Sequence, residues 1–371
     1  MIEVRKVEVD KSKRSIIISD IHANLALFKS LLRKVNYTKD DYLFINGDLC
    51  EKGPESLAVI DYVREIYNQS DKVYITKGNC DVVHRYIYNG NEGIISYMNR
   101  QKNSILNEML TKYDETLEDF PDLSKLGGFY RQHFHEELEW LESLPIAYET
   151  EEFIVIHAGL EDIKDWKQTE EKTALYAPAF YEQGHQADKL VIVGHWPVVN
   201  YRAQQVSSNN PIIDFDKKVI ALDGGNQIKK DGQLNALIIE NGTYSFTYVD
   251  ELSEEMIIQK GHSDSTGRIG TVTYPNYEMK IIEEEEYFTL CENSKLGIQQ
   301  WIKNEYLIVE NEQAHCKGDL STTFLSVEQG DSVWIVDNKC AGYSLVKKIS
   351  GEVGWIPKDC LKTVDIQLKR V

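Results

Sequence analysis

The sequence has little of what secreted or membrane-spanning chains need. Its six cysteines include no C-x-x-C pair, and residues 1–13 alternate charged and apolar side chains. No run of about 18 apolar residues, the length that predicts a membrane-spanning helix, occurs in it. We therefore expect no signal peptide, no transmembrane helix, reduced thiols and a cytoplasmic location.

Positive charge is also scarce, because 41 lysines and arginines face 60 acidic residues and leave a formal net charge of −19. A general affinity for nucleic-acid backbones or anionic membranes requires a positive field, so we expect neither as a partner. An acidic chain suits a site for divalent cations, although many soluble proteins are acidic without one. The length of 371 residues predicts more than one domain.

The first third of the chain alternates predicted strands and helices. Apolar runs predict strands at 15–18, 42–45 and 72–76, and amphipathic patterns predict helices at 25–35 and 54–67. This order favours parallel pairing with right-handed crossovers, and thus an α/β fold.

The rest of the chain changes character twice. Residues 83–145 are polar and tyrosine-rich, and they predict a helical insertion near the site. Strands dominate again from residue 153 to about 248, with a hairpin at Asn241-Gly242.

Five short segments each follow a predicted buried strand, at the position where open α/β sheets form their sites. They are Ser19-Asp20-Ile21-His22, Gly47-Asp48, Gly78-Asn79-Cys80-Asp81, His157-Ala158-Gly159 and Gly194-His195-Trp196. One Gly-Asp or one strand-end histidine would usually be a turn or a core residue. Five such segments in order predict a site.

The residue types in these segments fit a two-metal phosphoesterase. Two divalent ions lower the pKa of a bridging water and clamp the phosphoryl oxygens. Carboxylate, amide and imidazole groups are the ligands that such ions take. The mixture is offered by Asp20, His22, Asp48, Asn79, His157 and His195. Asp48, in the central Gly-Asp turn, is the candidate for the bridging carboxylate.

These segments resemble the calcineurin-like metallophosphoesterase superfamily over residues 14–250. Three longer stretches, 47–63, 141–160 and 221–239, resemble its phosphoprotein phosphatase branch, which includes Ser/Thr phosphatases and bacterial diadenosine tetraphosphate hydrolases. The resemblance implies a β-sandwich flanked by helices and two metal ions, usually manganese, with iron or zinc as alternatives. It also implies that Asp20, His22 and Asp48 hold one ion, and that Asp48, Asn79, His157 and His195 hold the other.

Two positions depart from the pattern of this branch. Glu51-Lys52-Gly53 stands where the family has Asp-Arg before the glycine. Lys52 and Asn79 are candidate contacts for the substrate phosphate. Lys52 lacks the bidentate fork of arginine. The alternative is that Lys52 is only a solvated loop lysine.

Cys80 stands where the branch has the histidine that protonates the leaving oxygen and that is oriented by a carboxylate of the preceding loop. Asp81, the next residue in the same segment, is a further catalytic candidate. A thiol is a poor proton donor to an alkoxide. Two hypotheses follow. In one, the chain prefers substrates with good leaving groups; in the other, His84 protonates the leaving oxygen in place of the missing histidine. The simpler interpretation is that His84 is an ordinary polar residue of a helix.

The C-terminal region resembles SH3-like modules. We expect a catalytic domain over residues 1–250, a linker over 251–267, a looser module over 268–310 and a clearer one over 320–371. Four aromatic side chains would line peptide grooves for a protein partner or belong to small barrel cores: Trp301, Tyr306, Tyr343 and Trp355.

The sequence thus predicts a dinuclear-metal phosphomonoesterase that acts on a phosphorylated protein or small molecule through a metal-bridging hydroxide. The alternatives are a dinucleotide polyphosphate or phosphodiester hydrolase, and an inactive phosphoesterase scaffold that presents SH3-like modules.

Overall fold

The computed structural model describes residues 1–310 and 313–361. These residues form two compact units. Unit 1 comprises residues 1–197, 211–228 and 232–250, and unit 2 comprises residues 198–210, 229–231 and the described residues from 251 onward.

The first sheet of unit 1 contains the strands predicted in the first third of the chain. Its order is β11-β10-β2-β3-β4. The bounds are β2 (Ser15–Ser19), β3 (Tyr42–Asn46), β4 (Val73–Thr76), β10 (Gln233–Glu240) and β11 (Thr243–Asp250). The pairs β2–β3 and β3–β4 are parallel, and they are connected through α1 (Leu25–Lys34) and α2 (Ser56–Gln69). The predicted parallel order and the predicted β10–β11 hairpin are confirmed.

The second sheet of unit 1 has the order β1-β5-β6-β7-β9-β8. Its strands are β1 (Val4–Lys6), β5 (Ala147–Glu149), β6 (Phe153–Ile156), β7 (Leu190–Val193), β8 (Ile212–Asp214) and β9 (Val219–Ala221). The pairs β6–β7 and β7–β9 are parallel, so their carboxyl ends lie at the same edge.

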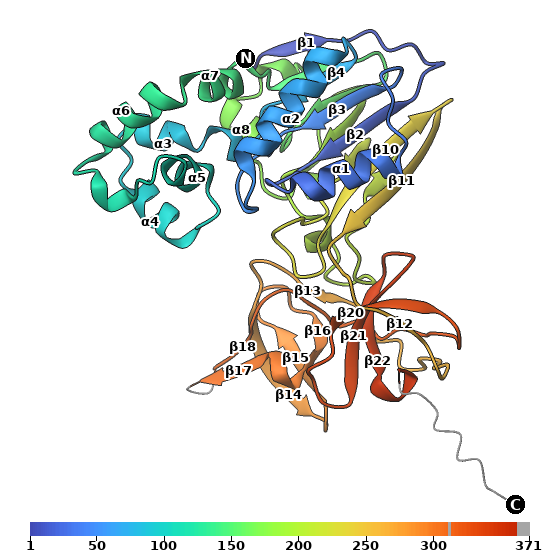
Figure 1. Ribbon diagram of the computed structural model, residues 1–371. Coiled ribbons are helices and arrows are strands. Elements are labelled where there is room, and N and C mark those ends of the chain that lie inside the picture. The colour runs from blue at the N-terminus through green and yellow to red at the C-terminus, as the bar shows by residue number, and fades with distance from the viewer. Residues whose placement is uncertain (311–312, 362–371) are drawn as a thin grey trace, which may run out of the picture. The chain divides into compact units, whose positions relative to one another are not determined.

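The two sheets pack face to face as a sandwich. Alternate residues of a strand point to opposite faces. Ile17 and Phe44 therefore share one core with Val155 and Ile192 of the other sheet. Ile16, beside Ile17 on β2, belongs to the core that α1 and α2 cover. The predicted metallophosphoesterase sandwich flanked by helices is confirmed (Figure 1).

Helices fill the stretch predicted as an insertion. They are α3 (His84–Tyr88), α4 (Gly93–Arg100), α5 (Ile105–Thr111), α6 (Leu123–His133) and α7 (His135–Ser143). These helices share a core with α1 and α2, to which Met98, Leu106 and Tyr130 contribute. Two short helices, α8 (Glu171–Tyr176) and α9 (Phe180–Gln183), lie between β6 and β7 in the chain.

The described residues of unit 2 from 251 onward form strands joined by turns and short 3₁₀ segments. One sheet has the order β12-β20-β21-β22, with β12 (Glu255–Ile257), β20 (Ser332–Asp337), β21 (Tyr343–Lys348) and β22 (Val353–Pro357). A second has the order β16-β15-β14-β18-β17, with β14 (Glu278–Glu284), β15 (Phe288–Asn293), β16 (Gln299–Lys303), β17 (Leu307–Glu310) and β18 (Gln313–Cys316). A short third sheet pairs β13 (Thr271–Val272) with β19 (Leu320–Ser321).

Strand pairing crosses the segment borders that we expected in this region. Strand β12 lies inside the predicted linker 251–267 and pairs with β20. Strand β18 lies beyond residue 310, where we ended the first module, and pairs with both β14 and β17. Residues 362–371 of the second module lie outside the described residues. An all-β C-terminal region is confirmed, while its SH3-like identity and its peptide partner stay predictions.

The four aromatic candidates of unit 2 divide between core and rim. Trp355 is fully buried, and its indole Nε1 donates a hydrogen bond to the Ser321 carbonyl at 2.7 Å. Of the two alternatives for Trp355, a peptide groove or a barrel core, the structure supports the core, because the ring is fully buried. Trp301 is partly buried, with the Arg268 guanidinium 3.7 Å from its ring centre.

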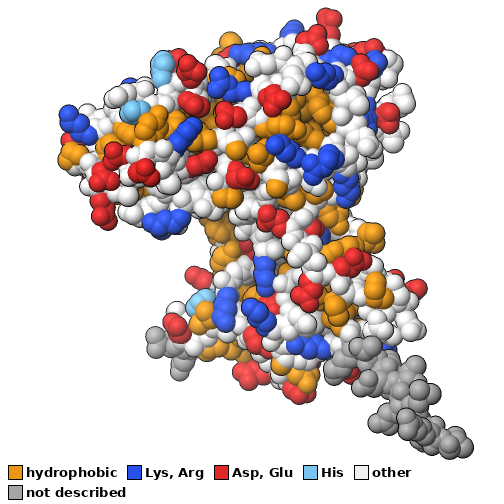
Figure 2. Space-filling view, viewed as in Figure 1, with side chains coloured by type: hydrophobic (Ala, Val, Ile, Leu, Met, Phe, Trp, Pro, Cys, Tyr) orange, Lys and Arg blue, Asp and Glu red, His pale blue; other side chains and the backbone are white. Residues whose placement is uncertain are grey.

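The surface of the described residues carries many charged side chains. Acidic and basic side chains are intermixed on the face shown in Figure 2. Across residues 1–310 and 313–361, no helix has the length and hydropathy that a membrane span requires. The six cysteines are buried and unbridged.

Candidate metal centre

The loops that follow β2, β3, β4, β6 and β7 bring the five predicted segments together. The backbone in these loops is unusual, because Asp20, His22, Asp48 and His195 all have positive φ angles of 57°, 48°, 51° and 65°. Residues other than glycine rarely adopt this conformation, and strained residues cluster at functional sites. The shared positive φ angles mark these loops as a candidate functional site.

Two glycines allow the loops to approach one another closely. A Cβ atom on Gly78 would lie 2.2 Å from Asp48 Oδ1, and one on Gly194 would lie 2.1 Å from Asp20 Oδ2. Real Cβ atoms do not tolerate such distances, so a side chain at either position would displace a carboxylate of the centre.

Three of the predicted ligands form one group. His22 Nε2 lies 4.0 Å from Asp20 Oδ1 and 3.9 Å from Asp48 Oδ2. The other ring nitrogen, Nδ1, is 3.3 Å from the carbonyl oxygen of Cys50. A hydrogen bond donated there leaves the Nε2 lone pair directed at the two carboxylates, as in many metal-bound histidines.

Four predicted ligands form a second group on the other oxygen of Asp48. His157 Nε2 lies 3.3 Å from Asp48 Oδ1 and 3.0 Å from Asn79 Oδ1. His195 Nδ1 lies 2.8 Å from the same Asn79 oxygen. His157 Nδ1 is 3.0 Å from the Asn46 carbonyl, which again leaves Nε2 to face the group. Asp48 thus presents one carboxylate oxygen to each group.

Burial and neighbouring carboxylates together shift the pKa values of the centre. It lowers the pKa of His22 and His195 to about 4, so both imidazoles are neutral at pH 7. Burial also lowers the pKa of His157, but the Asp48 carboxylate outweighs it and raises that pKa to about 10. Burial and the nearby Asp223 and Asp48 raise the pKa of Asp20 well above its ordinary value.

Buried, mutually repelling carboxylates beside the neutral imidazoles of His22 and His195 and an amide oxygen are a donor set that divalent cations stabilise. The residues therefore fit two metal ions, one for each group.

Asp81 organises the loops that carry these residues. Its Oδ2 accepts hydrogen bonds from the amides of Gly78 at 2.8 Å and Asp48 at 2.9 Å. Its Oδ1 accepts from the amides of Leu49 at 2.8 Å and Cys50 at 3.3 Å. Burial and the neighbouring Asp48 raise the pKa of Asp81 to about 7. Asp81 therefore fixes the loop of Asp48 against the loop of Asn79.

Cys80 lies at the centre itself. Its amide donates to Asp48 Oδ1 at 2.8 Å, and its Sγ is within 4.8 Å of ligand atoms of His22 and Asp48. Burial and the Asp48 carboxylate raise the pKa of the thiol well above its ordinary value, which keeps it protonated.

The other two substrate-handling candidates are placed differently. His84 is buried, and its Nε2 lies 2.9 Å from Glu142 Oε1 on α7, so we do not propose it as the leaving-group acid. Lys52 lines a cavity together with Asn79 and Cys80, and its Nζ is 5.6 Å from the ring centre of Tyr97.

Asp223 and Tyr97 had no place in our sequence predictions. Asp223 is fully buried and close enough to Asp20 to raise the pKa of that carboxyl. It follows β9 as the predicted residues follow their strands, and that position was an available signal. Glu51 accepts hydrogen bonds from the Tyr97 hydroxyl, the Ser104 hydroxyl at 2.8 Å and the Ile105 amide at 2.8 Å. No local pattern predicts these contacts, which tie the loop after β3 to the helical insertion.

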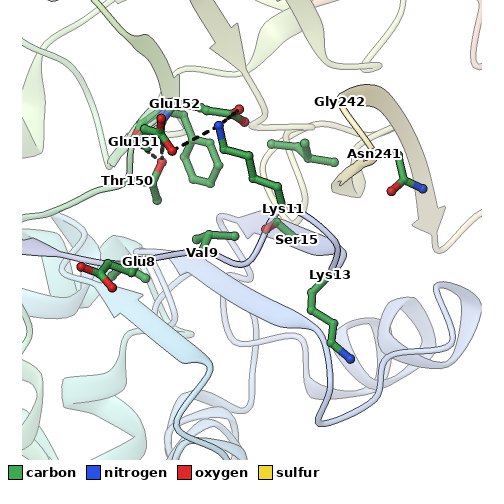
Figure 3. A pocket seen from close by; sticks show the side chains of 13 residues that line it. Glu8, Val9, Lys11, Lys13, Ser15, Thr150, Glu151, Glu152, Asn241 and Gly242 are labelled. Carbon is green, nitrogen blue, oxygen red and sulfur yellow. Dashed lines mark hydrogen bonds and ion pairs between the residues drawn. The ribbon is translucent and has the colours of Figure 1, made fainter.

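A larger cavity of unit 1 contains none of the candidate residues. It measures about 810 Å³ and is lined by parts of residues 7–15, 150–153 and 239–242. Figure 3 shows Lys11 reaching toward Glu151 and Glu152, with its Nζ at 3.1 and 2.9 Å from their carboxylates. The Lys11 ammonium is therefore paired with two carboxylates of the cavity.

A large part of the chain is similar to known proteins. Residues 13–238 match the family model of the calcineurin-like phosphoesterases. The chain is 46% identical over 66 residues to a symmetrical bis(5′-nucleosyl)-tetraphosphatase of Buchnera aphidicola, a match that covers 18% of this chain and 23% of that protein. It is 30% identical over 147 residues to the corresponding enzyme of Pectobacterium atrosepticum, covering 39% of this chain and 42% of the relative.

The chain thus matches less than half the length of these relatives. Among solved structures, a protein serine/threonine phosphatase from Saccharomyces cerevisiae is 11% identical, with a TM-score of 0.44 over 68% of this chain and 85% of that one.

Proposed function

Because the chain belongs to the calcineurin-like phosphoesterase family, whose members are hydrolases, we propose that unit 1 hydrolyses phosphomonoesters with two bound divalent ions, manganese foremost. Asp20, His22 and Asp48 would hold one ion. Asp48, Asn79, His157 and His195 would hold the other. The observation that carries the proposal is the Asp48 carboxylate, which presents Oδ2 to the first group and Oδ1 to the second.

The bound ions would activate water near neutral pH and neutralise charge on the phosphoryl group. The chain contributes positioning and charge around them. Asp81 holds the loops of Asp48 and Asn79 in register through backbone amides. Lys52 and Asn79 line the adjoining cavity and would contact phosphoryl oxygens. Cys80 lies where a leaving oxygen would depart, and its thiol is a weak acid.

A second candidate function is hydrolysis of dinucleotide polyphosphates. The names of the Buchnera and Pectobacterium relatives favour it, since both are bis(5′-nucleosyl)-tetraphosphatases. An inactive scaffold is disfavoured, because both groups of candidate ligands are complete and face Asp48.

A manganese-supplemented assay of four substrates separates these functions. We expect turnover of para-nitrophenyl phosphate to exceed that of its bis-ester, of diadenosine tetraphosphate and of phosphoserine peptides. A preference for diadenosine tetraphosphate would support the second candidate. No turnover of any substrate, together with no bound metal by elemental analysis, would support the scaffold.

Replacing Cys80 with histidine should raise kcat on alkyl phosphates about 10²-fold, because general acid catalysis contributes roughly that factor or more to a poor leaving group. Turnover of para-nitrophenyl phosphate should change little, since its leaving group needs no proton. Cys80→Ser is the matched control, which removes the thiol without adding an acid. Equal effects of the two substitutions would show that the acid at position 80 does not limit turnover.

A further inference from the structure

A cavity of about 290 Å³ adjoins the candidate metal centre within unit 1. It shares Asn79 and Cys80 with the centre, and the Asn79 oxygen is the one that contacts His157 and His195. The other walls are mainly aromatic and aliphatic: Val83, Tyr86, Ile94, Tyr97 and Tyr176. Lys52 is the one charged residue among those that line it.

The tyrosine rings of the cavity are held in place by their hydroxyl groups. The Tyr97 hydroxyl donates to Glu51, and the hydroxyls of Tyr86 and Tyr176 share a hydrogen bond. The His195 ring is hydrogen-bonded to the backbone carbonyl of Tyr176, which ties this wall to the centre. Since these hydroxyls are engaged with the protein, the cavity offers ring faces to a ligand.

Size and openness restrict what such a ligand would be. Small-molecule sites measure about 300–1,000 Å³, so a cavity at the lower limit fits one ring system. Tyr86 remains 39% exposed, which leaves one wall open to solvent and to the remainder of a larger substrate. Aromatic walls favour an aromatic guest through stacked or edge-to-face contacts.

We propose that this cavity binds the aromatic leaving group of an aryl phosphate monoester, with the ring attached directly to the scissile oxygen, as in a phosphotyrosyl group. The proposal rests on the proposed phosphomonoesterase function of the centre. The ring is adjacent to the phosphate because the cavity begins at Asn79 and Cys80. A nucleobase would be separated from its phosphate by a ribose.

An aryl leaving group also suits the chemistry of position 80. The oxygen of a water molecule forms a new bond to phosphorus and gives up a proton. The bond from phosphorus to the aryl oxygen breaks, and its electron pair leaves with the phenolate. The phenolate takes a proton from solvent, so the products are inorganic phosphate and a phenol. No strong acid is required where Cys80 stands.

The test compares kcat/KM for phosphotyrosine and phosphoserine in the manganese-loaded full chain, wild type and Tyr176→Ala. The intrinsic difference between the two leaving groups is the same in both proteins, so the change in the ratio reports the cavity. We expect the ratio of phosphotyrosine to phosphoserine to fall roughly tenfold in the variant. Tyr86→Ala should act in the same direction, whereas Tyr67→Ala, an exposed tyrosine of α2 outside the cavity, should leave the ratio unchanged.

Three results would overturn the proposal or locate its failure. An unchanged ratio in both cavity variants excludes the cavity as the aryl site. A loss on 5′-AMP without a loss on phosphotyrosine shows that the cavity holds a nucleobase instead. If the wild type hydrolyses none of these substrates, the proposed function fails. In that case, calorimetry that compares the binding of phenylphosphonate and methylphosphonate still tests the cavity. Tighter binding of phenylphosphonate to the wild type, lost in Tyr176→Ala, would support the cavity as the aryl site.

Discussion

Asp48→Asn should lower kcat/KM on para-nitrophenyl phosphate by about 10³-fold or more, since the charge stabilisation provided by a metal site is worth several kcal/mol. Asp48 presents Oδ2 to His22 and Oδ1 to His157. The amide of asparagine keeps the size of the side chain but offers one oxygen and no charge. One substitution therefore weakens both ion sites, and the manganese content should fall from two ions per chain to one or fewer.

Asp41→Asn is the matched control for this substitution. Asp41 is also a buried carboxylate of unit 1, and it pairs with Arg14 at 2.9 Å. Losing that charge should reduce stability without changing the metal content or kcat/KM. Full activity of Asp48→Asn with two bound ions would show that the bridging role is assigned wrongly.

Asp81→Ala should have the largest effect on stability, about 3 kcal/mol or more, because each buried donor left without a partner costs roughly 1–3 kcal/mol. The Asp81 carboxylate accepts from the amides of Gly78, Asp48 and Leu49 at 2.8 to 2.9 Å. These amides have no other acceptor within the loops that carry the centre. Activity should fall as well, because the loops of Asp48 and Asn79 lose their common support.

Calorimetry of the full chain measures this effect as a lower Tm of the transition that manganese stabilises. Asp122→Ala is the control, because Asp122 accepts from the Lys125 amide at 2.8 Å as the N-cap of α6. Removing that cap should cost about 1 kcal/mol and leave activity unchanged. If Asp81→Ala were no more destabilising than Asp122→Ala, the amide network around Asp81 would not support the centre.

The strand-end residues could be predicted because strands and sites obey local rules. A buried parallel strand appears as a continuous apolar run, and the residue after it lies at the sheet edge. Asp20, Asp48 and His157 could therefore be chosen without coordinates. Their division into two groups came from the family resemblance, and the contacts of Asp48 are consistent with it.

Contacts between distant segments could not be predicted in the same way. Tyr97 and Glu51 meet because α4 folds back on the loop after β3, and neither residue lies in a periodic pattern that indicates the other. Trp355 illustrates the same limit in unit 2, since a Gly-Trp pair in a strand does not reveal which face is covered. The segment around β12 is polar enough to indicate a linker, yet its backbone pairs with β20.

The dinuclear centre itself is tested most directly by the metal content of the wild-type protein. Elemental analysis after loading with manganese and removal of unbound ions should give two ions per chain. We expect two ions because Asp48 faces two complete groups of candidate ligands. A content of one ion or none in protein that hydrolyses para-nitrophenyl phosphate at full rate would contradict the two-ion centre.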